Sequence, residues 1–126
     1  MRNIFYRLKK DEKGQSLVEF AFVIIPLVLL LLGIIEFSWL FNGQMIITGA
    51  AREGARASVI GEDAEEAVNK YISASAVIVK DVLIIPGNQG EEKWKEVTVN
   101  GEMEPLVGFF LHDTINLTAK SKMRQE

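Results

Sequence analysis

Residues 20–35 are sixteen uncharged and almost wholly apolar residues, and this run strongly limits what the chain can fold into. A helix of that length rises about 24 Å, slightly less than the roughly 30 Å hydrocarbon core of a bilayer. Extending the helix to residues 17–41 makes it long enough and includes only two charged residues, Glu19 and Glu36. The sequence therefore predicts one membrane span over about residues 17–41, inside a longer helix over residues 15–60.

Glu19 lies at the start of this span. A charged side chain inside a bilayer is costly, most of all at the bilayer centre, and an intramembrane acid is by default a functional candidate. We therefore expect Glu19 to have a partner at the membrane boundary.

The charged residues are distributed unevenly and predict the orientation of the span. Residues 1–14 contain five basic and two acidic residues, whereas the whole 126-residue chain has a net charge of −3. Basic residues flanking a span favour the cytoplasm, so we predict a basic cytoplasmic leader over residues 1–14 and an acidic extracytoplasmic head over residues 61–126 of a single-pass inner-membrane protein. The acidic head has no basic stripe for phosphates, which argues against a nucleic-acid partner.

Small residues follow the span without a turn signal and continue the helix. Gly49 and the four-residue series Ala50, Gly54 and Ser58 allow close approach of another helix. A glycine in a helix costs about 0.8–1 kcal/mol relative to alanine, so a packing role would explain these residues. The alternative is a small-residue linker after the span.

Charged residues in the same segment are candidates for an interaction site. Arg52 and Arg56 lie four residues apart on one helical face, and Glu53 can reach Arg56 at three residues' distance. Most such charges are simply solvated, so these three residues indicate binding only weakly.

The head is predicted to be a small α+β unit with one short helix and an antiparallel sheet of about three or four strands. Gly61 ends the long helix, and acidic residues open the next one, as the helix dipole favours. The Asn100-Gly101 pair predicts a hairpin turn, and the apolar residues 106–111 a loop packed on the core. The expected elements are a helix over residues 62–72, a strand over 77–85, a mobile loop over 87–93, and strands over 95–99 and 114–120.

The sequence contains few residues that are suited to catalysis or metal binding. It has no cysteine, and its one histidine, His112, is followed by Asp113 in a pattern that is typical of a surface loop. No serine lies beside a base, and no phosphate-binding glycine loop follows a strand. We therefore expect a protein that is not an enzyme, with no cofactor, no metal and no small-molecule substrate.

A cut after Gly14 would give Glu19 the partner that it needs. The cut would remove the basic leader and expose the amine of Gln15 at the cytoplasmic edge of the membrane. The new cationic amine could pair with Glu19, either in the same chain one helical turn away or in a neighbouring subunit.

Gly14, followed by Glu19 and Phe20 and then by an apolar helix, resembles the class III signal of type IV prepilins. More narrowly, the chain resembles the TadE-like family, the pseudopilins or minor pilins of the tight-adherence (Tad, or Flp) pilus. The resemblance covers residues 14–58 best, through residues 14–20 and 50–57. Flp-type pilins commonly carry tyrosine after the glutamate, so Phe20 argues against the major pilin.

The resemblance implies a structural or assembly role rather than catalysis. It implies cleavage after Gly14 by an inner-membrane prepilin peptidase, storage in the membrane, and a part in pilus assembly or at the pilus tip, and so in surface adherence. The implied partners are the membrane, the prepilin peptidase, other pilins or pseudopilins, and the inner-membrane assembly platform.

Two further hypotheses fit a chain with one apolar segment. The chain could be an uncleaved, membrane-anchored protein whose head binds an extracytoplasmic partner, with Glu19 as an incidental boundary charge. A secretory signal cut near Gly49 is disfavoured, because the uncharged stretch is too long and the cut would lie too far beyond it. A membrane enzyme lacks candidate residues.

Overall fold

The computed structural model describes residues 12–125, and the chain divides into two compact units with a boundary between Ile35 and Glu36. Most of the predicted leader, residues 1–11, lies outside the described residues. The second unit contains the C-terminal part of the long helix together with the head, which confirms the predicted α+β class.

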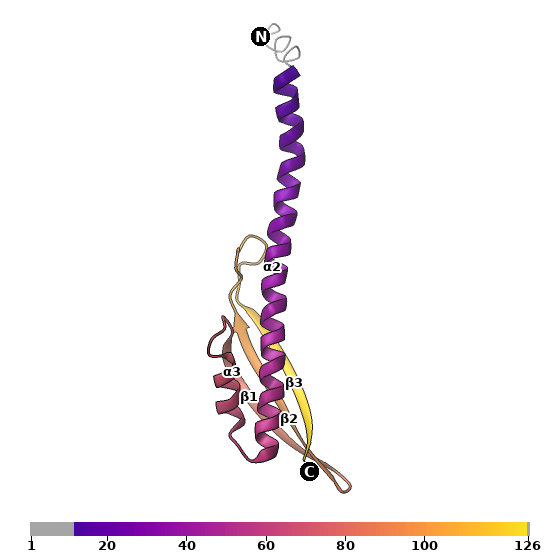
Figure 1. Ribbon diagram of the computed structural model, residues 1–126, viewed down its shortest axis with the longest axis vertical. Helices are drawn as coiled ribbons and strands as arrows, with labels where there is room; N and C mark the ends of the chain where they lie inside the picture. Colours follow the sequence, from indigo (N-terminus) through magenta and orange to yellow (C-terminus); the bar gives the residue numbers. More distant parts are fainter. Residues whose placement is uncertain (1–11, 126) are drawn as a thin grey trace. The chain divides into compact units, whose positions relative to one another are not determined.

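The long helix, α2, runs from Glu12 to Ile60 without interruption (Figure 1). It begins slightly before the predicted residue 15 and continues through Pro26, which lacks the amide hydrogen for one helical hydrogen bond. Gly61 follows its last residue with a φ of +87°, a conformation that glycine adopts without a steric penalty. The predicted end of the helix at Gly61 is therefore confirmed.

The short helix, α3, runs from Ala64 to Ile72. Asp63 caps its first turn, because one carboxylate oxygen accepts hydrogen bonds from the backbone N–H groups of Glu65 at 2.9 Å and Glu66 at 3.4 Å. This cap explains why α3 begins two residues later than the acidic residues of its first turn suggest.

Three antiparallel strands form one sheet in the order β1-β2-β3, with bounds β1 Ile78–Gln89, β2 Glu92–Met103 and β3 Ile115–Gln125. Gln89 pairs with Glu92 across a tight turn, in which Gly90 has a φ of +70°. Residues 87–93 are therefore mostly strand, and their prediction as a loop is wrong.

The predicted hairpin turn at Asn100-Gly101 is also wrong, because both residues lie inside β2. Gly101 is buried and pairs with Val79 on one side and Leu117 on the other. A Cβ atom there would lie 3.0 Å from Cδ1 of Ile47 on α2. Glycine is needed at this position because the strand approaches the helix closely, so it does not mark a turn.

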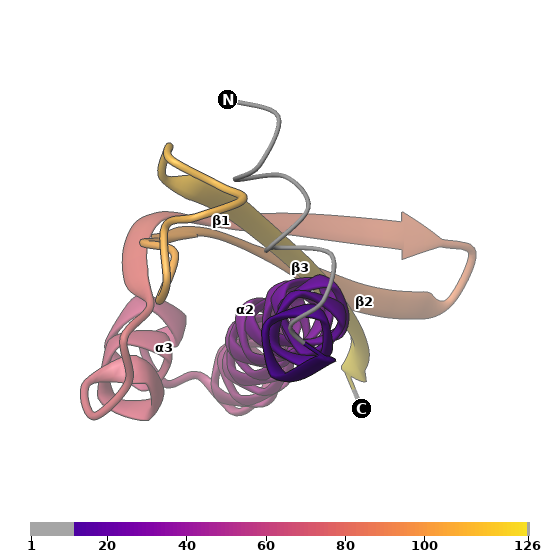
Figure 2. The ribbon, with the colours of Figure 1, turned by 90° about the horizontal axis from the view of Figure 1, so that it is seen from above.

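The core lies on one face of the sheet, which α3 and the C-terminal part of α2 cover (Figure 2). Alternate residues of β2 face the helices, as the strand period requires, and Val97, Val99 and Met103 are almost completely buried. The head therefore uses the end of α2 as part of its own core, which supplies packing that a small isolated domain lacks.

Candidate functional site

The predicted processing and assembly residues lie in the first turns of α2. Gln15, Glu19 and Phe20 are exposed, and 63% of the surface of Phe20 is accessible to solvent. The side-chain amide of Gln15 donates a hydrogen bond to Oε1 of Glu19 at 3.3 Å. The side chains of residues 15 and 19 thus meet across one helical turn.

Gly14 is the third residue of α2 and is exposed. Glycine is about 1 kcal/mol less favourable than alanine in a helix interior, so Gly14 weakens α2 locally. The role of Gly14 in a cut stays a prediction.

The small residues of the second half of α2 pack against the head of the same chain. Ala50 is fully buried, and a Cβ atom on Gly54 would lie 2.7 Å from Cγ2 of Val68 on α3. Gly49 faces the hydroxyl end of Tyr71, and the buried hydroxyl of Ser58 donates to the backbone oxygen of Ala55 at 2.8 Å. The close approach that these residues permit is to α3 and the sheet, and packing between subunits through them stays a prediction.

Replacing Gly54 with alanine should destabilise the head, whereas Gly49→Ala should not. The new methyl group at residue 54 would press on the stiff, fully buried Val68, at an expected net cost of about 1–2 kcal/mol after the gain in helix propensity. At residue 49 it would meet only the end of Tyr71, which is 51% exposed and can move.

Thermal unfolding of the full chain in detergent micelles, followed by tryptophan fluorescence, compares the two variants. Gly54→Ala should lower the unfolding temperature by several degrees, because 1 kcal/mol corresponds to roughly 4–8 °C for a domain of this size. Equal shifts for both variants would show that Gly54 does not set the distance between α2 and α3.

The predicted interaction residues form a surface pair. A guanidinium nitrogen of Arg56 lies 3.4 Å from Oε1 of Glu53, three residues earlier on α2, and both side chains are substantially exposed. Arg52 is exposed as well. An exposed pair of this kind contributes little to stability, about 0–1 kcal/mol, and a binding role for the three residues stays a prediction.

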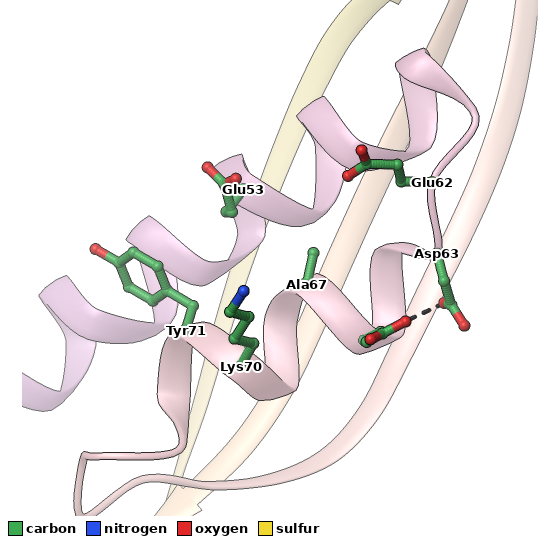
Figure 3. A pocket seen from close by; sticks show the side chains of 7 residues that line it. Glu53, Glu62, Asp63, Ala67, Lys70 and Tyr71 are labelled. Atoms are coloured by element: carbon green, nitrogen blue, oxygen red, sulfur yellow. Dashed lines mark hydrogen bonds between the residues drawn. The ribbon is translucent and has the colours of Figure 1, made fainter.

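Sequence reasoning did not predict the open groove of about 540 Å³ between α2 and α3, beside Glu53 (Figure 3). Its lining mixes acidic residues with Lys70 and Tyr71. No group of three His, Cys, Asp or Glu side chains within residues 12–125 is arranged to hold a metal ion. The charges that line the groove are of both signs and do not indicate a class of ligand.

The residue that sequence reasoning passed over is Glu36. It is only 3% exposed, and its Oε2 accepts a hydrogen bond from the backbone N–H of Val107 at 2.8 Å. Its Oε1 is buried and has no hydrogen-bond partner among the described residues. A buried acid with one unsatisfied oxygen lowers the stability of the fold, so the presence of Glu36 at this position calls for an explanation. The only sequence signal was its position directly after the apolar run.

Glu36 holds the connection between β2 and β3, residues 104–114, which we call the apolar loop. A second contact lies three residues further along α2, where the indole N–H of Trp39 donates to the backbone oxygen of Glu104 at 3.1 Å. Most of residues 106–111 are exposed, so the prediction that they pack on the core is wrong. The loop is fixed at its base by Glu36 and Trp39 rather than by burial of its apolar side chains.

His112 lies in the same loop and is exposed. It is the only histidine of the chain, and the loop places it away from the buried core residues of α2, α3 and β2. Its position agrees with the interpretation of His112 as a surface residue.

Comparison with known families agrees with the resemblance in the sequence. The family model for TadE-like protein matches residues 14–56, from the predicted cut site through the span and into the small-residue part of α2. No curated protein and no solved structure matches the chain. The resemblance to the TadE-like family is thus confirmed over these residues, while α3 and the sheet lie outside the match.

Proposed function

We propose that this chain, whose residues 14–56 match the TadE-like family, is a pilin-like structural or assembly protein of a Tad (Flp) type IV pilus. In this proposal a prepilin peptidase cuts it after Gly14, and it then takes part in pilus assembly and surface adherence as a pseudopilin or minor pilin. Its partners would be other pilins or pseudopilins and the inner-membrane assembly platform.

One observation carries the proposal furthest, which is the exposed apolar surface of α2 that begins at the predicted cut site. Within the described residues, α2 is the one helix long and apolar enough to cross a membrane, and none of its most apolar 18-residue window is buried. Such a surface requires lipid or the apolar helices of other subunits. A pilin-like protein would use both, first as a membrane protein and later within an assembly.

The position of Gly14 supports the proposed cut. It separates the basic residues, which favour the cytoplasm, from the apolar surface that begins at Leu17, so the bond after it would lie at the cytoplasmic membrane boundary. The cut would remove the positive leader that holds the N-terminus in the cytoplasm. The mature helix could then leave the bilayer without carrying those charges across it.

The arrangement of Gln15 and Glu19 supports a role for the carboxylate after the cut. The two residues lie one helical turn apart, and their side chains meet at 3.3 Å. The amine released on Gln15 could therefore pair with its own Glu19 or with that of an adjacent subunit. A cationic amine and a carboxylate would reduce each other's cost in an apolar surrounding. We infer that this pairing favours ordered assembly of the cut chains.

The alternative of an uncut, anchored binding protein rests on the groove beside Glu53, since an extracytoplasmic head needs a surface for its partner. The groove is open and mixed in charge, and it points to no ligand class. It therefore favours this alternative only weakly.

Deletion of this chain from its own cell tests the proposed function. We expect tight-adherence pili, counted by electron microscopy, to disappear or fall severalfold, and the wild-type chain supplied in trans to restore them. Cells that keep their normal number of pili and their normal attachment to surfaces without the chain would contradict the proposal.

A further inference from the structure

The tip of the apolar loop consists of Phe109, Phe110 and Leu111, which expose between 38% and 56% of their surfaces. The rings of Phe109 and Phe110 meet edge to face with centroids 5.0 Å apart. Leu106, which lies between the two contacts with α2, is 54% exposed as well. No charged residue lies between Glu104 and His112. Contiguous apolar surface of this kind marks an interaction site, because scattered single residues do not form such a cluster.

The base of the loop is fixed to the part of α2 that directly follows the apolar run. Glu36 is the next residue after Ile35, and the loop contacts Glu36 through Val107 and Trp39 through Glu104. Tryptophan is enriched at the interface between a membrane and water. The apolar loop is therefore held against the last residues of the predicted span, near its extracytoplasmic end.

We propose that the tip of the apolar loop inserts into the extracytoplasmic leaflet as a second membrane contact of the head. The occupant of the surface is lipid, at the depth of the headgroups and upper acyl chains. This inference rests on the membrane span of α2 and is independent of the cut after Gly14.

Glu36 and Trp39 lower one cost of such an insertion, because each satisfies one polar backbone group of the loop. Irregular backbone cannot lie against hydrocarbon unless its polar groups have partners. The carboxylate of Glu36 satisfies the N–H of Val107, and the indole of Trp39 satisfies the carbonyl of Glu104. This account also explains the buried acid, because Glu36 serves the loop backbone and positions the tip at the interface.

Site-directed spin labelling of the full, uncut chain tests the proposal, and the absence of native cysteine makes single labels simple. The chain is placed in vesicles of phosphatidylethanolamine and phosphatidylglycerol, with a nitroxide on Phe110→Cys or, in a second variant, Phe109→Cys. Collision with oxygen reports lipid, and collision with an aqueous nickel chelate reports water. Leu30→Cys in the span and Ser73→Cys after α3 are the lipid and water controls.

We expect the ratio of oxygen to nickel collisions at residues 109 and 110 to exceed that at Ser73 several-fold and to lie below that at Leu30. Glu36→Gln should keep this ratio, because its amide oxygen can still accept from Val107, whereas Glu36→Leu should lower it severalfold toward the water control. A severalfold fall with Glu36→Leu alone would identify Glu36 as a positioning residue.

Two outcomes would overturn the proposal. Labels at residues 109 and 110 that behave like the label at Ser73 would place the loop in water, and labels shielded from both reagents would place it against a second copy of the chain. If Leu30 reports lipid in either case, the membrane span stands and only the inference about the loop fails. If Leu30 reports water, the membrane span itself fails.

Discussion

Replacing Gly14 with arginine is expected to abolish removal of the leader. In the proposed processing, the peptidase must reach the backbone at Gly14, where the absence of a side chain leaves the following bond uncovered. Arginine would cover that backbone with a long side chain and favour the helix by about 1 kcal/mol relative to glycine. The variant should accumulate in the membrane at the size of the uncut chain.

Lys13→Arg is the matched control, because it places the same guanidinium one residue earlier without changing Gly14. It should be cut as the wild type is, so that an immunoblot shows the shorter chain. Normal cutting of Gly14→Arg would remove the reason to identify Gly14 as the processing residue. Loss of cutting in both variants would show that a guanidinium side chain near the bond, rather than the loss of Gly14, blocks the step.

Replacing Glu19 with alanine is expected to leave the cut intact and to prevent assembly. The carboxylate lies one turn beyond Gln15, where the amine released by the cut would be. Loss of one partner from a buried charge pair costs about 3–5 kcal/mol, which corresponds to more than about a hundredfold in an equilibrium constant. The mature chain should therefore be present at its normal level while the number of pili falls at least severalfold.

Glu53→Ala is the control for Glu19→Ala, because it removes a carboxylate from the same helix at an exposed site. Its pair with Arg56 contributes about 0–1 kcal/mol, so pili should form normally. Glu19→Gln separates charge from hydrogen bonding and should also impair assembly if the amine requires a negative partner. Normal pili with Glu19→Ala would refute the charge-pairing argument.

Much of the fold could be predicted because its signals are local. The apolar run predicts α2, Gly61 marks its end, and the alternation around Val97 and Val99 predicts β2. The prediction of a turn at Asn100-Gly101 is wrong. The local preference of this pair for a turn is weaker than the stabilisation from pairing with both neighbouring strands and from close packing on Ile47. Local propensity gives way there to tertiary contacts.

The site could be predicted only where its parts are close in sequence. Gly14, Gln15 and Glu19 lie within two turns of one helix, so their spacing alone places them together. The contact between Glu36 and Val107 joins residues that are 71 positions apart, and no periodic pattern indicates it. The same is true of the small residues around Gly54, whose partners on α3 and β2 emerged only from the fold.

The N-terminal mass of the wild-type protein, isolated from its native membrane, tests the central claim most directly. A chain that begins at Gln15, with or without a methyl group on its amine, is the predicted result. A chain that still begins at Met1 in cells with an active prepilin peptidase would contradict the proposed processing. A chain that begins near Arg52 would contradict it as well, because such a cut releases a secreted domain.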